Sequence, residues 1–132
     1  MNFELNAIKE AHAKVKSGAD FAQYIQDLIQ IGVKKYDSFV SNGRTVYFGE
    51  NHFQIKSLPI YSRLNIANIS DKERFKHYLK SYQRGQTDYA TFCRHSAETG
   101  VEKWTVDVAT MTCTYYDKLN NMMLEEQIPT PH

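Results

Sequence analysis

The sequence predicts an α+β fold built from an internal duplication of an αα-βββ unit, with the strands in one or two antiparallel sheets and the helices packed on one face. Two observations support this fold class. Similar residues recur at a fixed spacing of 68 positions, which indicates that a segment was duplicated. Within each copy, apolar residues first follow helical spacing and then alternate as in strands. Each copy therefore predicts two helices followed by three strands.

The repeat is clearest in two pairs of segments. Residues 20–24 (DFAQY) match residues 88–92 (DYATF), and residues 32–36 (GVKKY) match residues 100–104 (GVEKW). Equivalent segments of a duplication are expected to adopt the same backbone shape. The sequence therefore predicts a single domain of two repeats with a connector between them. The domain spans 1–132, the repeats span about 1–57 and 70–128, and the connector spans 58–69.

The composition is that of a globular domain. The chain has 132 residues, of which 42% are hydrophobic and 23% are charged, so it is able to bury a core. Its net charge of +1 gives no overall attraction to nucleic acid or membranes. No apolar run approaches the roughly 20 residues of a membrane span, and the N-terminus lacks the features of a signal peptide. With two cysteines and no export signal, we expect a cytoplasmic protein with reduced thiols.

Four helices are expected from apolar periodicity and from signals at the helix ends. Asp20 and Asp88 are suited to cap the second helix of each half, and residues 70–73 (SDKE) have the capping-box pattern. Glycines follow the helical stretches, where a left-handed residue is favoured; they are Gly18, Gly32, Gly85 and Gly100. The expected helices span about 3–17, 20–31, 71–84 and 88–99.

Alternating side chains predict a three-stranded meander after the helices of each half. The rows that point to the same side are Tyr36, Ser38, Val40, Thr45 and Tyr47 in the first half, and Trp104, Val106, Val108, Cys113 and Tyr115 in the second. Asn42-Gly43 is typical of a type I′ hairpin turn between the first two strands. Third strands are expected near 53–56 and 122–126.

Neither cysteine is predicted to be a catalytic nucleophile. Cys93 takes the place of Ile25 on an apolar helix face, where a free cysteine behaves as a small hydrophobic residue. His95 lies about 200° around the helix from Cys93, so the two side chains cannot share a face. No two histidines have i, i+4 spacing, and nucleotide-binding and hydrolase motifs are absent. We therefore expect no metal site and no cofactor, and we favour a binding protein over an enzyme.

A row of basic residues marks the third predicted helix. Lys72, Lys76, Lys80 and Arg84 are spaced four residues apart and therefore lie along one helix face. Such a row is typical of a solvated helix face, which is the interpretation we favour. The alternative is a ridge that contacts the phosphates of a nucleic acid.

The outer side of the second hairpin is a candidate ligand site. Polar Asp107, Thr114 and Tyr116 stand there in place of the apolar residues of the first hairpin. The candidate contacts are Trp104, Asp107, Tyr115, Tyr116 and Glu126, with Glu125 as an alternative to Glu126. A carboxylate beside phenols is able to bind a small polar ligand or to transfer a proton. The alternative is a polar sheet face that simply meets water.

The first hairpin has apolar residues on both sides. Phe39, Val46 and Phe48 occupy the side opposite to the predicted core. If no helix covers that side, the pattern predicts contact with another protein chain, either as a homodimer interface or through pairing of strand edges.

The chain also resembles the YdfO-like family, whose members are small bacterial and prophage-encoded proteins grouped as a domain of unknown function and sometimes labelled phage envelope protein. The motifs of the second half are residues 83–93 (QRGQTDYATFC), 100–107 (GVEKWTVD), 112–117 (TCTYYD) and 126–129 (EQIP). In the first half, Gly32-Val33 with Tyr36 and residues 45–49 (TVYFG) are similar to the family pattern. The resemblance spans nearly the whole chain. It implies an α+β fold and no established activity, cofactor or catalytic set.

The leading hypothesis for function is a non-enzymatic cytoplasmic accessory protein that binds an unidentified protein partner. It depends on the lack of a recognisable catalytic group and on the apolar surface of the first hairpin. The first alternative is a small-molecule-binding protein or enzyme that uses the second hairpin. The second alternative is nucleic-acid binding through residues 71–84. No membrane partner is expected.

Overall fold

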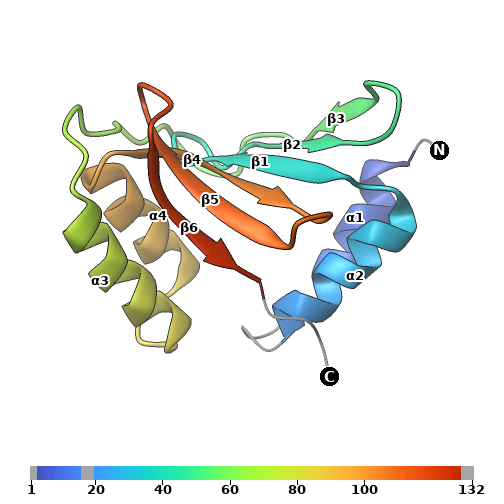
Figure 1. Ribbon diagram of the computed structural model, residues 1–132, viewed down its shortest axis with the longest axis horizontal. Coiled ribbons are helices and arrows are strands. Elements are labelled where there is room, and N and C mark those ends of the chain that lie inside the picture. Colours follow the sequence, from blue (N-terminus) through green and yellow to red (C-terminus); the bar gives the residue numbers. More distant parts are fainter. Residues whose placement is uncertain (1–2, 16–19, 129–132) are drawn as a thin grey trace.

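The computed structural model describes residues 3–15 and 20–128 and has an α+β fold, as the sequence predicts (Figure 1). The strands form one six-stranded antiparallel sheet with the order β3-β2-β1-β4-β5-β6. The elements are α1 (Leu5–His12), α2 (Phe21–Ile31), β1 (Lys35–Phe39), β2 (Thr45–Phe48), β3 (Gln54–Lys56), α3 (Lys72–Gln83), α4 (Tyr89–Glu98), β4 (Val101–Asp107), β5 (Thr112–Asp117) and β6 (Met122–Gln127). Only α1 is clearly shorter than expected, and residues 16 and 17 of its expected range lie outside the described residues.

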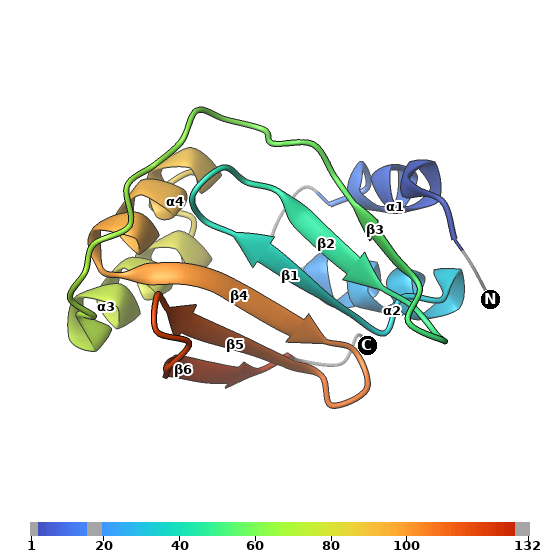
Figure 2. The same cartoon turned by 90° about the horizontal axis from the view of Figure 1, so that it is seen from above.

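The molecule has two layers. α1 and α2 pack beneath one end of the sheet, and α3 and α4 pack beneath the other end (Figure 1). Both pairs lie on the same face, which we call the inner face. The opposite, outer face is seen directly in Figure 2, where no described helix crosses it. None of the helices in the described part of the chain combines the length and the apolar character that a membrane crossing requires.

The two halves have the same order of elements and meet at the centre of the sheet. β1 pairs with β4 so that Asp37 lies opposite Thr105, and these two residues occupy equivalent positions in the two halves. The residues on either side follow the same symmetry: Tyr36 lies opposite Val106, and their equivalents Trp104 and Ser38 lie opposite each other. Two equivalent antiparallel strands in this register are related by a local two-fold axis. The common origin of the halves stays a prediction, whereas the symmetric register is a feature of the fold.

The core lies between the inner face and the helices. Its fully buried side chains come from both halves, and they include Ile8, Ile25, Leu28, Phe75, Val101 and Val106. Phe75 of α3 contacts Tyr115 of β5 with ring centroids 4.9 Å apart, so the aromatic contact joins a helix to the sheet. Cys93 is also buried, as its match to Ile25 predicts. Burial of apolar surface from both helix pairs therefore holds the two layers together.

Glycines end the helices as the sequence predicts. Gly32, Gly85 and Gly100 all have positive φ, so each provides the left-handed residue that follows a helix. Gly18 lies outside the described residues. At the start of α4, the Asp88 carboxylate accepts a hydrogen bond of 2.8 Å from a backbone N–H in the first turn, which confirms its capping role.

The capping-box prediction for α3 is wrong. Asp71, rather than Ser70, caps this helix, because its carboxylate accepts a hydrogen bond of 3.1 Å from the Arg74 N–H. The Ser70 hydroxyl instead donates to the carboxylate of Asp117, the last residue of β5, at 2.7 Å. The local pattern predicts that the Ser70 hydroxyl caps α3, but this hydroxyl bonds to a residue that is distant in the chain. Asp20 likewise forms no capping bond to α2.

The β1–β2 turn also differs from its prediction. A type I′ turn needs positive φ at both central residues, but only Gly43 has it, with φ 76°. The connector explains the difference: the Ile60 N–H donates to the Asn42 carbonyl at 2.9 Å, and the Ile60 side chain occupies the space beside Gly43. Contact with a distant segment therefore sets the shape of this turn.

Candidate functional site

The sheet separates the five residues of the predicted second-hairpin site. Strand register places Trp104, Tyr115 and Glu126 on the inner face, and Asp107 and Tyr116 on the outer face. Trp104 and Tyr115 are buried parts of the core. The structure therefore does not bring the five side chains together around one ligand.

Asp107 stabilises a turn on the outer face. Its Oδ1 accepts hydrogen bonds from the N–H groups of Ala109 (2.9 Å) and Thr110 (3.1 Å), so the carboxylate closes the β4–β5 turn. Asp107 also lines an open hollow of about 410 Å³, together with Lys34 and Phe48. The two turn bonds explain the position of Asp107 without a ligand.

Tyr116 belongs to a group of outer-face side chains that interact with one another. The Lys103 ammonium lies 5.5 Å from the centroid of the Tyr116 ring and 3.8 Å from the Asp37 carboxylate. The same carboxylate accepts a hydrogen bond of 2.6 Å from the Thr105 hydroxyl. Because these polar groups are already paired, the arrangement favours a solvated sheet face over a ligand site.

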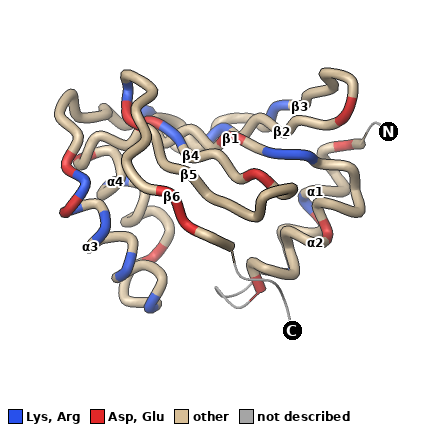
Figure 3. Tube along the Cα trace, in the orientation of Figure 1, with Lys and Arg blue, Asp and Glu red and all other residues tan. Residues whose placement is uncertain are grey.

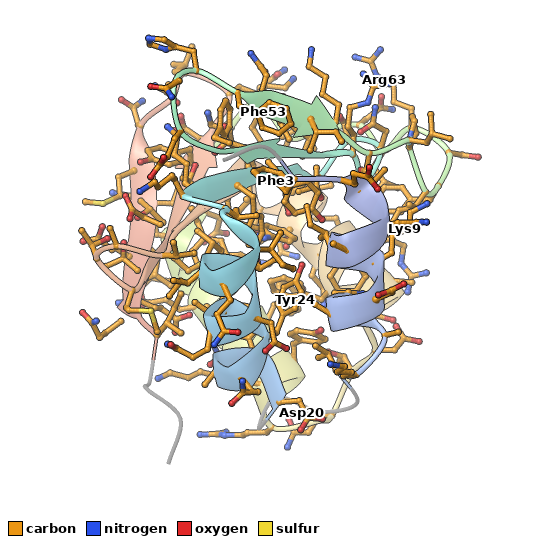
Figure 4. All side chains as sticks on the ribbon, turned by 90° about the vertical axis from the view of Figure 1, so that its right-hand side faces the viewer. Phe3, Lys9, Asp20, Tyr24, Phe53 and Arg63 are labelled. Atoms are coloured by element: carbon orange, nitrogen blue, oxygen red, sulfur yellow. The ribbon has the colours of Figure 1, made fainter. Side chains whose placement is uncertain are left out.

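A group of tyrosine and cysteine side chains on the inner face was not among the predicted site residues. One row across all six strands consists of Ile55, Tyr47, Tyr36, Val106, Cys113 and Glu126. After burial, which is the largest cause, Tyr24 of α2 and Tyr89 of α4 contribute to the raised pKa of the Tyr36 phenol. Figure 4 shows Tyr24 between α1 and α2, beneath the sheet. We call Tyr24, Tyr36, Tyr47, Tyr89 and Cys113 the inner tyrosine cluster.

Burial keeps the cluster protonated. It raises the pKa of the Tyr36 phenol well above its usual value and raises the pKa of the Cys113 thiol to about 12. Burial also raises the pKa of the Cys93 thiol. A thiol with a raised pKa is a poor nucleophile, because the thiolate is the reactive form. These groups are therefore suited to hydrogen bonding rather than to nucleophilic chemistry.

Glu126 lies where the inner row meets the edge of the sheet. The Gln83 side-chain amide donates to both of its carboxylate oxygens, at 3.1 and 3.3 Å, and so connects α3 to β6. Among the five predicted contact residues, Glu126 is the carboxylate that belongs to the inner row, and the Gln83 amide already donates to it.

The basic row of α3 faces solvent. Lys72, Lys76, Lys80 and Arg84 are all exposed, and Figure 3 shows the positive charges of α3 along the outside of the molecule. The ion pairs found in residues 3–15 and 20–128 do not involve these four side chains. The arrangement is compatible with a solvated face and with a phosphate-contacting ridge, so both interpretations stand.

Exposed apolar side chains lie near two turns at the end of the sheet that the connector crosses. Leu58 and Ile60 are 77% and 64% exposed near the β1–β2 turn. Ile69 and Leu119 are each 81% exposed near the β5–β6 turn, and strand register places both turns at the same end. We call Leu58, Ile60, Ile69 and Leu119 the connector surface. Its signal in the sequence is a set of scattered apolar residues in segments outside the helices and strands.

The similarity of this chain to known sequences extends over nearly all of the fold. Residues 9–127 match the family described as "Protein of unknown function (DUF1398)". The chain belongs to this family. The match extends from within α1 to the last residue of β6, so the DUF1398 domain includes both halves of the sheet. No curated protein has a sequence that matches this DUF1398 protein.

Proposed function

We propose that this DUF1398 protein is a non-enzymatic binding protein that docks a protein partner through the connector surface. The exposure of Leu58, Ile60, Ile69 and Leu119 is the observation that carries the proposal. Several large apolar side chains exposed to solvent at one end of a domain are typical of an interaction site. Because hydrogen bonds tie residues 60 and 70 to the two halves, the partner meets a preformed surface.

Charge around the connector surface favours an acidic partner. Residues 57–69 contain Arg63 and no Asp or Glu, and Lys56 precedes them. Lys118, next to Leu119, donates a hydrogen bond to the connector at Asn68 and adds a further positive charge. Such charges steer an oppositely charged partner and fix its orientation. The partner is expected to present apolar side chains flanked by Asp or Glu.

A second copy of the chain is the alternative partner. Val46 on the outer face of the first hairpin is flanked by the half-buried Phe39 and Phe48, and no described helix covers this face (Figure 2). Lys35 partly shields the Phe48 ring, with its ammonium 5.0 Å from the ring centroid. The connector surface is more exposed and is therefore favoured over this face. The YdfO-like assignment, prophage origin and cytoplasmic location belong to the same proposal, supported by the family motifs.

Photo-crosslinking tests the connector surface. Benzoylphenylalanine in place of Ile60 should give a discrete adduct with another protein in a lysate of the source cells. The same residue in place of Ile29, which is 42% exposed on α2, should not give that adduct. The purified partner should bind the Leu58→Ser, Ile60→Ser variant about tenfold more weakly, which corresponds to about 1.4 kcal/mol.

The outcomes separate the alternatives. If the only adducts join two copies of this chain, the result would favour a homodimer over a different protein partner. Equal adducts from positions 60 and 29, or none from position 60, would contradict docking at the connector surface. The fold should persist in the serine variants, because both side chains are exposed and surface substitutions usually change stability by less than about 0.5 kcal/mol.

A further inference from the structure

An open hollow lies on the sheet at the end opposite to the connector surface. It is found where β1 begins and where β2 and β4 end, and these three strand ends lie side by side (Figure 2). Lys35, Phe48, Phe53 and Asp107 belong to its lining, and its volume is about 410 Å³. Sites for small molecules typically have volumes of roughly 300–1,000 Å³, so the hollow is large enough for a small ligand.

Three side chains of different chemistry follow one another across the strands at this hollow. Strand pairing places Lys35 directly opposite Phe48 on one side and directly opposite Asp107 on the other. Opposite charges at such positions usually attract each other across the strands. Among the described residues, however, Lys35 and Asp107 form no ion pair. The Lys35 ammonium lies instead over the Phe48 ring, 5.0 Å from its centroid. The two charges therefore line the same hollow without neutralising each other.

Both charged groups keep hydrogen-bonding capacity for a ligand. The two turn bonds use only Oδ1 of Asp107, and no hydrogen bond to its Oδ2 occurs within the part of the chain that the structure describes. The Lys35 ammonium has three N–H donors. The neighbouring Lys34 differs, because its ammonium pairs with the Glu50 carboxylate at 3.2 Å. Lys35 is therefore the lysine of the hollow that has no carboxylate partner among the described residues.

These groups select a ligand that carries both charges. The Asp107 carboxylate would repel a simple anion, and the Lys35 ammonium would repel a simple cation. A ligand with an ammonium and a carboxylate satisfies both side chains. Neighbouring strands lie about 4.8 Å apart, so one small molecule is able to reach the two residues. Phe48 and Phe53 add aromatic surface, which favours a ring in the ligand. An aromatic α-amino acid has all three groups.

We propose that this hollow binds a free aromatic α-amino acid. The ammonium of the ligand pairs with Oδ2 of Asp107, its carboxylate pairs with the Lys35 ammonium, and its ring packs against Phe48 and Phe53. The site is one of recognition and includes no covalent step. It lies at the other end of the sheet from the connector surface, so it does not depend on partner docking.

A titration followed by NMR tests the ligand class. In ¹H–¹⁵N spectra, the amides of Gly49 and Ala109 report on the hollow, because both residues line it. The probes are L-phenylalanine, N-acetyl-L-phenylalanine without the ammonium, phenethylamine without the carboxylate, and glycine without the ring. L-Phenylalanine should bind about fivefold more tightly than each of the others, a factor that corresponds to about 1 kcal/mol, the size of a favourable exposed ion pair.

Two variants identify the charged contacts. Asp107→Asn keeps an oxygen for the turn bonds but removes the charge, so it should weaken L-phenylalanine binding about fivefold without weakening N-acetyl-L-phenylalanine binding. Lys35→Gln should weaken L-phenylalanine binding to a similar degree without weakening phenethylamine binding. Lys56→Gln makes the same charge change at an exposed position of β3 outside the lining and should alter neither. Each unaffected analogue also shows that the hollow keeps its shape in the variant.

Three results would overturn the proposal. They are the absence of any amide shift with L-phenylalanine at about 20 mM, equal affinities for L-phenylalanine and its analogues, and variants at Asp107 and Lys35 that leave L-phenylalanine binding unchanged or weaken all probes alike. An equal loss in Lys56→Gln would show that only the overall charge of the outer face matters, which also contradicts the site. Crosslinking at Ile60 tests the other end of the sheet, so its outcome has no bearing on these results.

Discussion

Gly100 follows the C-terminus of α4 and has a left-handed backbone conformation. Neighbouring backbone atoms leave no space there for a side chain. Its φ is +92°, and a Cβ atom there would lie 2.7 Å from the Ile69 carbonyl oxygen and 3.0 Å from the Ser70 Cα. Both neighbours are backbone atoms, at the end of the connector and in the residue that follows it, and a backbone cannot turn away as a side chain can. The glycine therefore satisfies a conformational requirement and a packing requirement at once.

Gly100→Ala and Gly85→Ala separate these two requirements. Gly85 has φ +77° but nothing within 4 Å of its added Cβ, so Gly85→Ala should cost about 1 kcal/mol of unfolding free energy. Gly100→Ala should cost about 2–4 kcal/mol, because the connector must also move. Urea unfolding of both variants measures the difference. Equal decreases in unfolding free energy would mean that the backbone next to Gly100 moves aside without an energetic cost.

The helix caps show when the local sequence is enough to predict the role of a single residue. Asp88 caps α4 as predicted, since cap and helix are neighbours in the chain. Ser70 does not cap α3, since Asp117, 47 residues away, competes for its hydroxyl. Local patterns predict residues whose partners are local, and they fail where a distant residue offers a charged partner.

At the scale of elements, α3 combines a buried face with a basic one. Phe75 and Leu79 are buried, whereas Lys76 and Lys80 point into solvent. The apolar spacing that predicts the helix also predicts which face is buried. It gives no information on whether the basic face contacts a phosphate backbone or water alone.

We expect the basic face of α3 to be solvated, so the protein should not retain a short DNA duplex or RNA strand in a shift assay at about 0.15 M salt. Lys76→Glu with Lys80→Glu should change the unfolding free energy by less than about 0.5 kcal/mol. Lys9→Glu with Lys14→Glu makes the same charge change on the N-terminal side of the chain. A shift that weakens with salt and with the α3 pair, but not with this control, would contradict the expectation.

The strands were predicted with the correct alternation, which made the inner and outer rows recognisable in each half. The combination of Trp104 and Tyr115 with Asp107 and Tyr116 into one site did not follow from that alternation, because a strand sends adjacent residues to opposite faces. The inner tyrosine cluster needs the pairing of β1 with β4, which no local pattern specifies.

At the scale of the whole molecule, burial of phenols and thiols makes stability sensitive to alkaline pH. Tyr36, Tyr115 and Cys113 have pKa values raised chiefly by burial, that of Cys113 from 9.0 to about 12. In the unfolded chain these groups ionise at about pH 9 to 10, so above this range the unfolded state binds fewer protons. Their contribution to stability is therefore complete below about pH 9 and is lost as the pH rises towards 12.

Urea midpoints between pH 7 and pH 11 test this dependence. The midpoint should fall above pH 9, and each titrating group should contribute up to about 1.4 kcal/mol per pH unit. Cys113→Val should reduce the slope, because it removes the group with the lowest unfolded pKa among the three. A midpoint that is constant up to pH 11 would show that these side chains reach solvent when they ionise.

By itself, the sequence determined the αα-βββ unit, its repetition, the faces of its strands and the burial of Cys93. These follow from spacing and from short-range end signals, which act between residues close in the chain. The tertiary structure decided the rest: one sheet rather than two, the meeting of β1 with β4, and the position of the connector over the β1–β2 turn. Those features depend on contacts between residues far apart in the chain, and such contacts alone place Tyr36 of the first half and Cys113 of the second half in one row of the sheet.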